Sequence, residues 1–273
     1  MILIGLTGSL ATGKSTVSRL LSAPPYSLPI IDADQLAREV VEPGTYGYYS
    51  IVHNFGPTTP DLLLPDDNGG DKKASKGRPI NRAALGRRVF GSEPDRVRDR
   101  KILNGIIHPL VRIAMARQIL YYHILGHWAV VLDVPLLFES GLDVFVSVVF
   151  MVSVTSPEMQ MKRLRERDKA LSQQEARDRV GSQMGVEEKV ERTRGRDASR
   201  GKVIRNDEGM EELQGEVRRV MGEIGAEGGG KVWGWWLWGS PVGAAAVSAL
   251  EVQKGWKARR KWEEERRRER ARL

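Results

Sequence analysis

The sequence predicts an α/β fold in which helices cover both faces of a parallel sheet. The apolar run at residues 2–7 is followed by a glycine-containing loop at 8–15, and residues 16–21 then have the apolar spacing of a helix. The loop matches G-x-x-x-x-G-K-[ST], a pattern that binds phosphate between a strand and a helix. Two further apolar runs, 129–132 and 144–154, have the form of strands buried on both faces. The chain is therefore predicted to be a P-loop NTPase.

The loop supplies the predicted nucleotide site. Its glycines allow backbone N–H groups to turn inward and form an anion-binding concavity at the start of the helix. Lys14 can reach the β- and γ-phosphates of ATP, and the Ser15 hydroxyl can bind Mg²⁺. The residues predicted to bind nucleotide are Gly8, Ser9, Leu10, Ala11, Thr12, Gly13, Lys14, Ser15 and Thr16.

Composition excludes several classes of site and partner. The 273 residues contain no cysteine, so disulfides, thiolate metal sites and cysteine catalysis are excluded. Residues 254–273 contain ten Lys/Arg and four Glu, a charge of +6 out of a net +8. Because the basic charge lies in this tail, it gives no reason to expect nucleic acid as a partner. The N-terminus lacks the pattern of a signal or transit peptide, so we expect a cytoplasmic protein. The sequence predicts no oligomeric state.

The chain continues after the first helix with a short strand at 30–31 and two aspartates, Asp32 and Asp34. Ligands bind at the carboxyl ends of strands in an open parallel sheet, so both carboxylates are candidate site residues. Aspartates after a strand also commonly cap the next helix, and we assign that role to Asp32. Residues 35–125 are mostly helical in pattern and predict a subdomain for a second substrate. Within it, residues 57–79 are rich in Pro, Gly, Asp and Lys and predict a flexible insertion.

The apolar run that ends at Asp133 has the form of a Walker B strand, whose acid faces Mg²⁺ directly or through water. Ser156-Pro157-Glu158 predicts the start of a helix and of a lid region at 156–195. Arg163 and Arg167 lie four residues apart and therefore on one helix face. They are either solvated surface arginines or, as we prefer in this context, clamps for a transferring phosphate.

Several segments in order along the chain together make the sequence resemble the dephospho-CoA kinase family. They are G-L-T-G-S-L-A-T-G-K-S-T at 5–16, I-D-A-D at 31–34, V-V-E-P-G at 40–44, F-G at 55–56, the segment 81–90, L-N at 103–104 with H-P at 108–109, V-P-L-L-F-E at 134–139, K-R-L-R-E-R-D at 162–168 and V-I-R-N at 203–206. The resemblance covers residues 1 to about 224. Ser9 stands where the family commonly has glycine, and Asp207 where it usually has asparagine.

The resemblance implies a kinase that uses ATP and Mg²⁺ to phosphorylate the ribose 3′-hydroxyl of dephospho-CoA. Asp34 would be the general base, and Lys14, Arg163 and Arg167 would be the other catalytic residues. Asn206 would lie on the nucleotide side, with Ser15 and Asp133 as metal ligands. Substrate-binding residues would be Thr7, Asp32, Asp34 and His108, although H-P at 108–109 could instead break a helix. The alternatives are another small-molecule or nucleoside-monophosphate kinase of this fold, and a regulatory P-loop nucleotide binder.

The kinase domain is expected to end at residue 227, and residues 228–273 form a tail of two parts. Residues 232–250 contain no charged residue and include four tryptophans, just reaching the length of a membrane span. This segment is either membrane-associated, tethering the protein to a cytosolic membrane face, or a helix packed on the domain, or a disordered end. Residues 254–273 predict a basic charged helix that is solvated or holds anionic lipid.

Overall fold

The computed structural model describes residues 1–65, 77–168, 180, 184–197, 199–227 and 241–270, which form two compact units. The first unit contains Met1–Ile30 and Gly126–Leu273, and the second contains Ile31–Leu125. The second unit has nearly the bounds of the helical subdomain predicted at 35–125. Part of the predicted insertion (66–76), part of the predicted lid (169–179 and 181–183) and residues 232–240 of the apolar tail segment lie outside the described residues.

The first unit is built on a parallel sheet, which confirms the predicted α/β class. The strands are β1 (Ile2–Gly8), β2 (Ile30–Asp32), β3 (Ala129–Asp133), β4 (Val148–Ser153) and β5 (Gly201–Arg205). Their order in the sheet is β2-β3-β1-β4-β5, with β3, β1, β4 and β5 parallel. Leu6 of β1 is in register with Asp133 of β3, and Gly8 with Val152 of β4. The loop after β1 therefore begins between the ends of β3 and β4.

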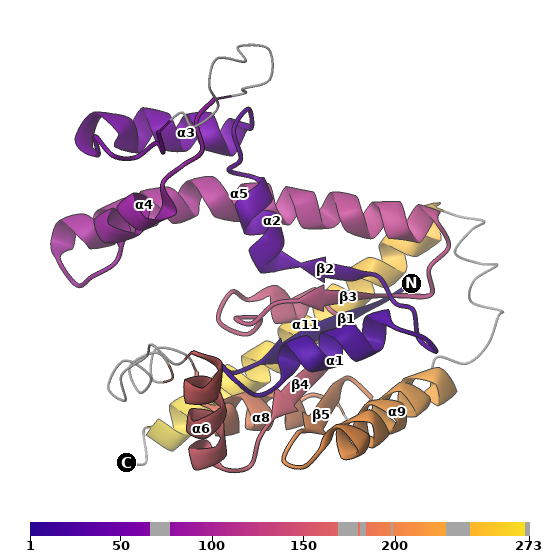
Figure 1. The fold of residues 1–273 in the computed structure, drawn as a ribbon. Helices are drawn as coiled ribbons and strands as arrows, with labels where there is room; N and C mark the ends of the chain where they lie inside the picture. The colour runs from indigo at the N-terminus through magenta and orange to yellow at the C-terminus, as the bar shows by residue number, and fades with distance from the viewer. Residues whose placement is uncertain (66–76, 169–179, 181–183, 198, 228–240, 271–273) are drawn as a thin grey trace. The chain divides into compact units, whose positions relative to one another are not determined.

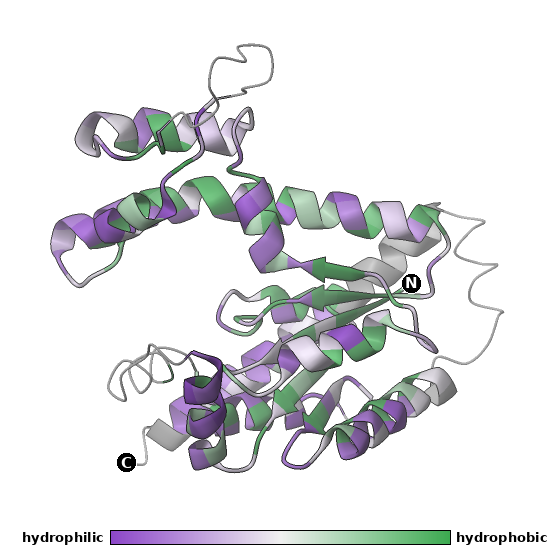
Figure 2. Ribbon diagram, in the orientation of Figure 1, coloured by the Kyte–Doolittle hydropathy of each residue, from purple (hydrophilic) through white to green (hydrophobic). Residues whose placement is uncertain are grey.

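Helices cover both faces of this sheet (Figure 1). α1 (Lys14–Ser22) and α9 (Met210–Glu227) lie on one face, and α8 (Val186–Arg194) and α11 (Pro241–Arg270) lie on the other. The core between the sheet and the α1/α9 layer contains Ile4, Leu6, Val17, Leu21, Phe150, Val152, Ile204, Leu213 and Val217. Figure 2 shows the hydrophobic residues concentrated in the central strands, whereas α6 (Pro157–Arg167), which follows β4, is mostly hydrophilic. The sheet interior is thus apolar on both sides, as the uninterrupted apolar runs predict.

The second unit is helical. Its elements are α2 (Ala33–Glu39), α3 (Tyr46–Phe55), the short 3-10 helix η1 (Gly56–Thr58), α4 (Arg82–Val89) and α5 (Pro94–Ile124). Its core contains Tyr48, Ile51, Phe55, Leu62, Ile80, Leu85, Val89 and Leu103. α5 continues through Pro109, so the interpretation of His108-Pro109 as a helix break is wrong. Contacts of α5 with α2, α3 and α4 explain why tertiary packing overrides the local cost of a proline inside the helix.

α11 packs against the connection between β3 and β4, which contains the 3-10 helix η2 (Leu142–Val144). Gly255 is buried there, and Arg259 lies 4.0 Å from Asp143. Arg266 pairs with Glu188 of α8 at 2.8 Å, and the Arg192 guanidinium lies 4.7 Å from the ring centroid of Trp262. One face of this basic helix is therefore packed on the first unit instead of being solvated. Among the helices that the structure describes, none has the length and apolar character needed to cross a membrane.

The close approach at Gly255 gives a stability prediction. A Cβ at this position would lie 2.4 Å from the Val144 carbonyl oxygen and 2.7 Å from its Cα, both backbone atoms that cannot move alone. We expect Gly255→Ala to lower the free energy of unfolding by about 1–3 kcal/mol, because the overlap forces α11 away from η2. Thermal or urea unfolding of the full chain measures this change.

Gly215→Ala is the matched control. Gly215 is exposed in α9, and a Cβ there has no neighbour within 4 Å. Alanine has the higher helix propensity, so this variant should raise the free energy of unfolding by about 0.5–1 kcal/mol. An equal stabilisation by both substitutions would contradict the packing of α11 on η2.

Candidate active site

The phosphate loop connects β1 to α1 and has the backbone of an anion-binding turn. Gly13 precedes the first residue of α1 with φ 92° and ψ 16°, and Ala11 also has a positive φ of 60°. The first N–H groups of a helix have no intrahelical acceptor, so those at the start of α1 are available to phosphate oxygens. A Cβ at position 13 would lie 2.1 Å from Asn206 Nδ2, so both the conformation and the space require glycine.

Three side chains fix the loop from its outer side. Thr12 Oγ1 donates to Ser9 O at 2.9 Å, Asn206 Nδ2 donates to Thr12 O at 2.9 Å, and Gln160 Nε2 donates to Leu10 O at 2.8 Å. Asn206 directly follows β5, and Gln160 lies in α6. These bonds use carbonyl oxygens of the loop, which leaves its inward N–H groups for a ligand. The loop is therefore shaped before any nucleotide binds.

The loop lysine and the Walker B aspartate meet at the ends of adjacent strands. Lys14 Nζ donates to Asp133 Oδ1 in an ion pair, with the Lys14 side chain partly exposed and the Asp133 carboxylate almost buried. The register of β1 and β3 dictates this proximity, because parallel strands end at the same edge of the sheet. The pair places a cation and a carboxylate beside the anion-binding turn.

The residues present fit a nucleoside triphosphate and a hard divalent cation. Ser9 Oγ is buried and has no hydrogen-bond partner among the described residues, so it can serve a phosphate oxygen. Ser15 is exposed at the start of α1, and its hydroxyl and the nearly buried Asp133 carboxylate are the two oxygen groups predicted to bind the metal. The described residues contain no group of three His, Cys, Asp or Glu that could hold a metal. Two protein oxygens suit Mg²⁺, which usually keeps waters and takes its other ligands from substrate phosphates.

The two predicted lid arginines differ in their surroundings. Arg163 donates from Nη1 to Asn206 O at 2.7 Å, whereas Arg167 is exposed at the last position of α6. Gln160, Arg163 and Arg167 share one face of α6 by their spacing of three and four residues. This face of α6 therefore serves both the loop, through Gln160, and the end of β5, through Arg163.

Asp32 and Asp34 take different positions at the start of α2. Asp32 is the N-cap, and its Oδ1 accepts from the backbone N–H of Asp34 at 2.8 Å and of Gln35 at 3.0 Å. The capping role assigned to Asp32 is confirmed. Asp34 lies in the first turn with an exposed side chain, as does His108 on α5. Both belong to the second unit, so their distance from the loop is not defined and their roles stay predictions.

Thr7 and Asp207 make structural contacts. Thr7 is fully buried, and its Oγ1 donates to Pro135 O at 3.0 Å. Asp207 accepts from the backbone N–H of Thr155 at 2.6 Å and from its hydroxyl at 2.7 Å. Asp207 therefore ties the end of β5 to the start of α6, and Asn206 alone of this pair reaches the loop.

Sequence reasoning missed Gln160 and a cluster of mostly buried charges between α8 and the connection from β3 to β4. Gln160 could have been found from its spacing to Arg163, which puts it on the same helix face. The cluster consists of Lys189, Arg192 and Arg196 on one side and Glu139 and Asp143 on the other. Burial lowers the pKa of the Arg196 guanidinium below its usual range, and the neighbouring Asp143 carboxylate opposes this shift. The spacing 189, 192, 196 is a helix-face signal, but nothing local marks it as buried.

Comparison with known proteins places the chain in a family. The dephospho-CoA kinase family model matches residues 2–212. The chain is 41% identical to a dephospho-CoA kinase of Saccharomyces cerevisiae over 224 residues, which covers 82% of this chain and 83% of the relative. It is 40% identical over 214 residues to a dephospho-CoA kinase of Listeria innocua, covering 78% and 92% of the two chains.

Two solved structures are also similar to this chain. The crystal structure of a Thermus thermophilus protein is similar with a TM-score of 0.61 and 30% identity, covering 82% of this chain and 97% of that one. A dephospho-CoA kinase from Campylobacter jejuni has a TM-score of 0.58 and 25% identity, covering 83% and 98%. On these matches and the phosphate loop described above, the chain belongs to the dephospho-CoA kinase family.

Proposed function

We propose that this chain transfers the γ-phosphoryl group of ATP to the ribose 3′-hydroxyl of dephospho-CoA, giving CoA and ADP in the last step of CoA synthesis. The observation that carries the proposal is the pairing of Lys14 with Asp133 beside the anion-binding turn, in a chain of this kinase family. A P-loop without an acceptor reaction would serve only to bind or hydrolyse nucleotide. The family match supports phosphoryl transfer over nucleotide binding alone, and it supports dephospho-CoA as the acceptor.

The donor half of the reaction uses the first unit. The N–H groups at the start of α1 and Lys14 hold the phosphates and stabilise the charge that develops on the transferred group. Mg²⁺, held by Ser15 and Asp133, would neutralise the phosphate oxygens when bound. Arg163 and Arg167 add positive charge from α6. Arg163 must exchange its bond to Asn206 O for a phosphate oxygen in order to do so.

The acceptor half uses Asp34 as general base. Its carboxylate takes the proton of the 3′-hydroxyl as that oxygen forms a bond to the γ-phosphorus, while the bond from phosphorus to the β–γ bridging oxygen breaks and ADP leaves. The cap formed by Asp32 supports this role, because two backbone hydrogen bonds fix the turn that carries Asp34. His108, exposed on α5, would contact the acceptor.

The function is tested by giving the purified full chain ATP, Mg²⁺ and a panel of acceptors. We expect ADP to form only when dephospho-CoA is present, with CoA as the second product identified by mass spectrometry. Turnover of a nucleoside monophosphate with none of dephospho-CoA would overturn the assignment in favour of a different kinase of this fold.

Replacing Asp34 by asparagine tests the general base. Asparagine keeps the size of the side chain and cannot accept the proton, so we expect kcat to fall by about 10²- to 10⁴-fold. ATP affinity, measured by calorimetric titration, should stay within about twofold because the donor site lies on other residues. A kcat within a few-fold of wild type would show that another group takes the proton.

Asp32→Asn is the matched control for that experiment. Asparagine is as good an N-cap as aspartate, so the turn that carries Asp34 should keep its stability and conformation. We therefore expect the loss of kcat for Asp32→Asn to be far smaller than for Asp34→Asn. Equal losses would assign proton transfer to the pair of carboxylates instead of Asp34 alone.

A further inference from the structure

α8 presents a buried cationic face to the rest of the first unit. Lys189, Arg192 and Arg196 are spaced by three and four residues, which places them on one side of the helix and the turn that follows it. The Lys189 side chain is 0% exposed, and Arg192 and Arg196 are buried as well. Charged side chains are almost never fully buried unless they are paired. The residues that pair with these cations therefore indicate the role of this face of α8.

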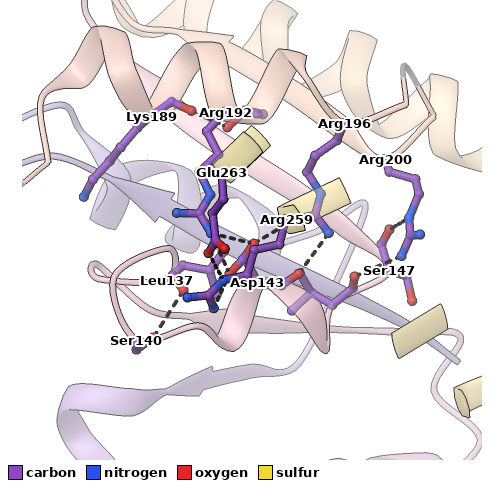
Figure 3. Close-up of polar contacts among 12 residues, drawn as sticks. Leu137, Ser140, Asp143, Ser147, Lys189, Arg192, Arg196, Arg200, Arg259 and Glu263 are labelled. Atoms are coloured by element: carbon purple, nitrogen blue, oxygen red, sulfur yellow. Dashed lines mark hydrogen bonds and ion pairs between the residues drawn. The ribbon is translucent and has the colours of Figure 1, made fainter. Parts of the chain in front are cut away.

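Among the described residues, the hydrogen-bond and ion-pair partners of these three side chains all lie in the connection that runs from β3 to β4, residues 134–147. Lys189 Nζ lies 2.9 Å from Glu139 Oε1 and donates to Pro135 O at 3.2 Å. Arg192 and Arg196 both pair with Asp143 Oδ2 at 3.2 Å. Arg200 continues the series with a bond from Nε to Ser147 O at 3.1 Å. Figure 3 shows Arg192, Arg196 and Arg200, with Arg259 of α11, directed toward the connection.

Arg192 and Arg196, at the end of the series away from the phosphate loop, have a structural role. The Asp143 side chain is 1% exposed and pairs with Arg192, Arg196 and Arg259, and its backbone oxygen accepts from Arg196 Nη2 at 2.9 Å. Asp143 lies ten residues after Asp133 along the chain. Loss of a cation at this end should loosen the connection and α11 without moving the phosphate loop.

The other end of the series, at Lys189, contacts residues next to the candidate active site. Pro135 is two residues after Asp133, and its carbonyl oxygen accepts from both Lys189 and Thr7. Thr7 directly precedes Gly8, the first residue of the loop. Glu139 is 26% exposed and also accepts from the Met184 N–H at 3.3 Å, just before α8. The Lys189 ammonium thus joins the backbone after the Walker B aspartate to β1 and to the start of α8.

We propose that Lys189 is a positioning residue for phosphoryl transfer. It acts through Pro135 O and the Glu139 carboxylate, and it fixes the backbone that carries Asp133 relative to the strand that carries the loop. The distance between Asp133, Lys14 and the bound phosphates depends on that backbone, and small displacements of catalytic groups reduce rates strongly. This inference rests on the kinase activity proposed above.

The test compares Lys189→Met with Arg196→Met, because each variant removes one buried cation from the same helix face and leaves one carboxylate without it. Both should lower the unfolding temperature by several degrees. Only Lys189→Met should lower kcat per folded molecule, by about tenfold or more, and raise the Mg²⁺ concentration that gives half-maximal rate. Arg196→Met should keep both values within about threefold.

A second readout does not depend on activity. Hydrogen exchange should become faster over residues 134–140 in Lys189→Met, and over residues 142–147 in Arg196→Met. Unchanged exchange over 134–140 overturns the proposal even where kcat falls. A wild-type chain that fails to phosphorylate dephospho-CoA would overturn the proposed function instead, which the exchange measurement distinguishes.

Glu139→Gln tests the same contact from its partly exposed side and should fold if Lys189→Met does not. We expect it to lower kcat in the same direction, and the double variant Lys189→Met/Glu139→Gln to lose less than the product of the two single losses. Independent losses that multiply, or equal kcat losses per folded molecule in Lys189→Met and Arg196→Met, would leave Lys189 a structural residue only.

Discussion

The ion pair between Lys14 and Asp133 is the contact on which the candidate site depends. It exists because β1 and β3 are adjacent parallel strands in a register that brings Leu6 opposite Asp133. The chain reaches β3 only after 120 residues, having formed β2 and the whole helical unit in between. A site made at the ends of two strands so distant in sequence requires the sheet to be assembled first. The continuous apolar runs of β1, β3 and β4 supply the burial that drives that assembly.

Features with a local signature could be predicted from the sequence. The phosphate loop, the aspartate at the end of β3 and the cap at Asp32 each follow from residue types at short, fixed spacing. Lys189 and Asp143 could not be predicted, because their partners lie 54 and 49 or more residues away and a lone Lys or Asp in a sequence is usually a surface residue. Gln160 has a partner 150 residues away, and only its spacing to Arg163 could have pointed to it. Thr7 was predicted to bind substrate because of the resemblance to the family. Its side chain is buried and donates to Pro135 O, so a residue that matches a family motif can also have a structural role. Pro109 shows tertiary packing overriding a local helix-breaking signal.

The C-terminal helix α11 illustrates how a charged segment packs one face against the rest of the first unit. The family match ends at residue 212, so α11 is an addition to the part of the chain that defines the family. Gly255 removes the side chain at the point of closest approach, and Arg259 brings a third guanidinium toward Asp143. One carboxylate cannot neutralise three guanidiniums, and Glu263 supplies a second acceptor to Arg259 at 2.9 Å. The Arg192 guanidinium also lies 4.7 Å from the centroids of both Phe138 and Trp262, where aromatic faces offset part of its desolvation.

The phosphate loop and the predicted general base Asp34 are held by different parts of the chain. The loop and the connection after Asp133 are held by partly buried hydrogen bonds from α6, from α8 and from Asn206, which follows β5, so the donor phosphates meet preorganised groups. Asp34 is instead on the second unit, in the first turn of a short helix that begins where the strand β2 ends. The cap at Asp32 fixes the conformation of that turn, because its carboxylate accepts from the backbone N–H groups of Asp34 and Gln35. Phosphoryl transfer gains from a rigid donor side, because the charge that develops on the transferred group then meets groups that need no reorganisation.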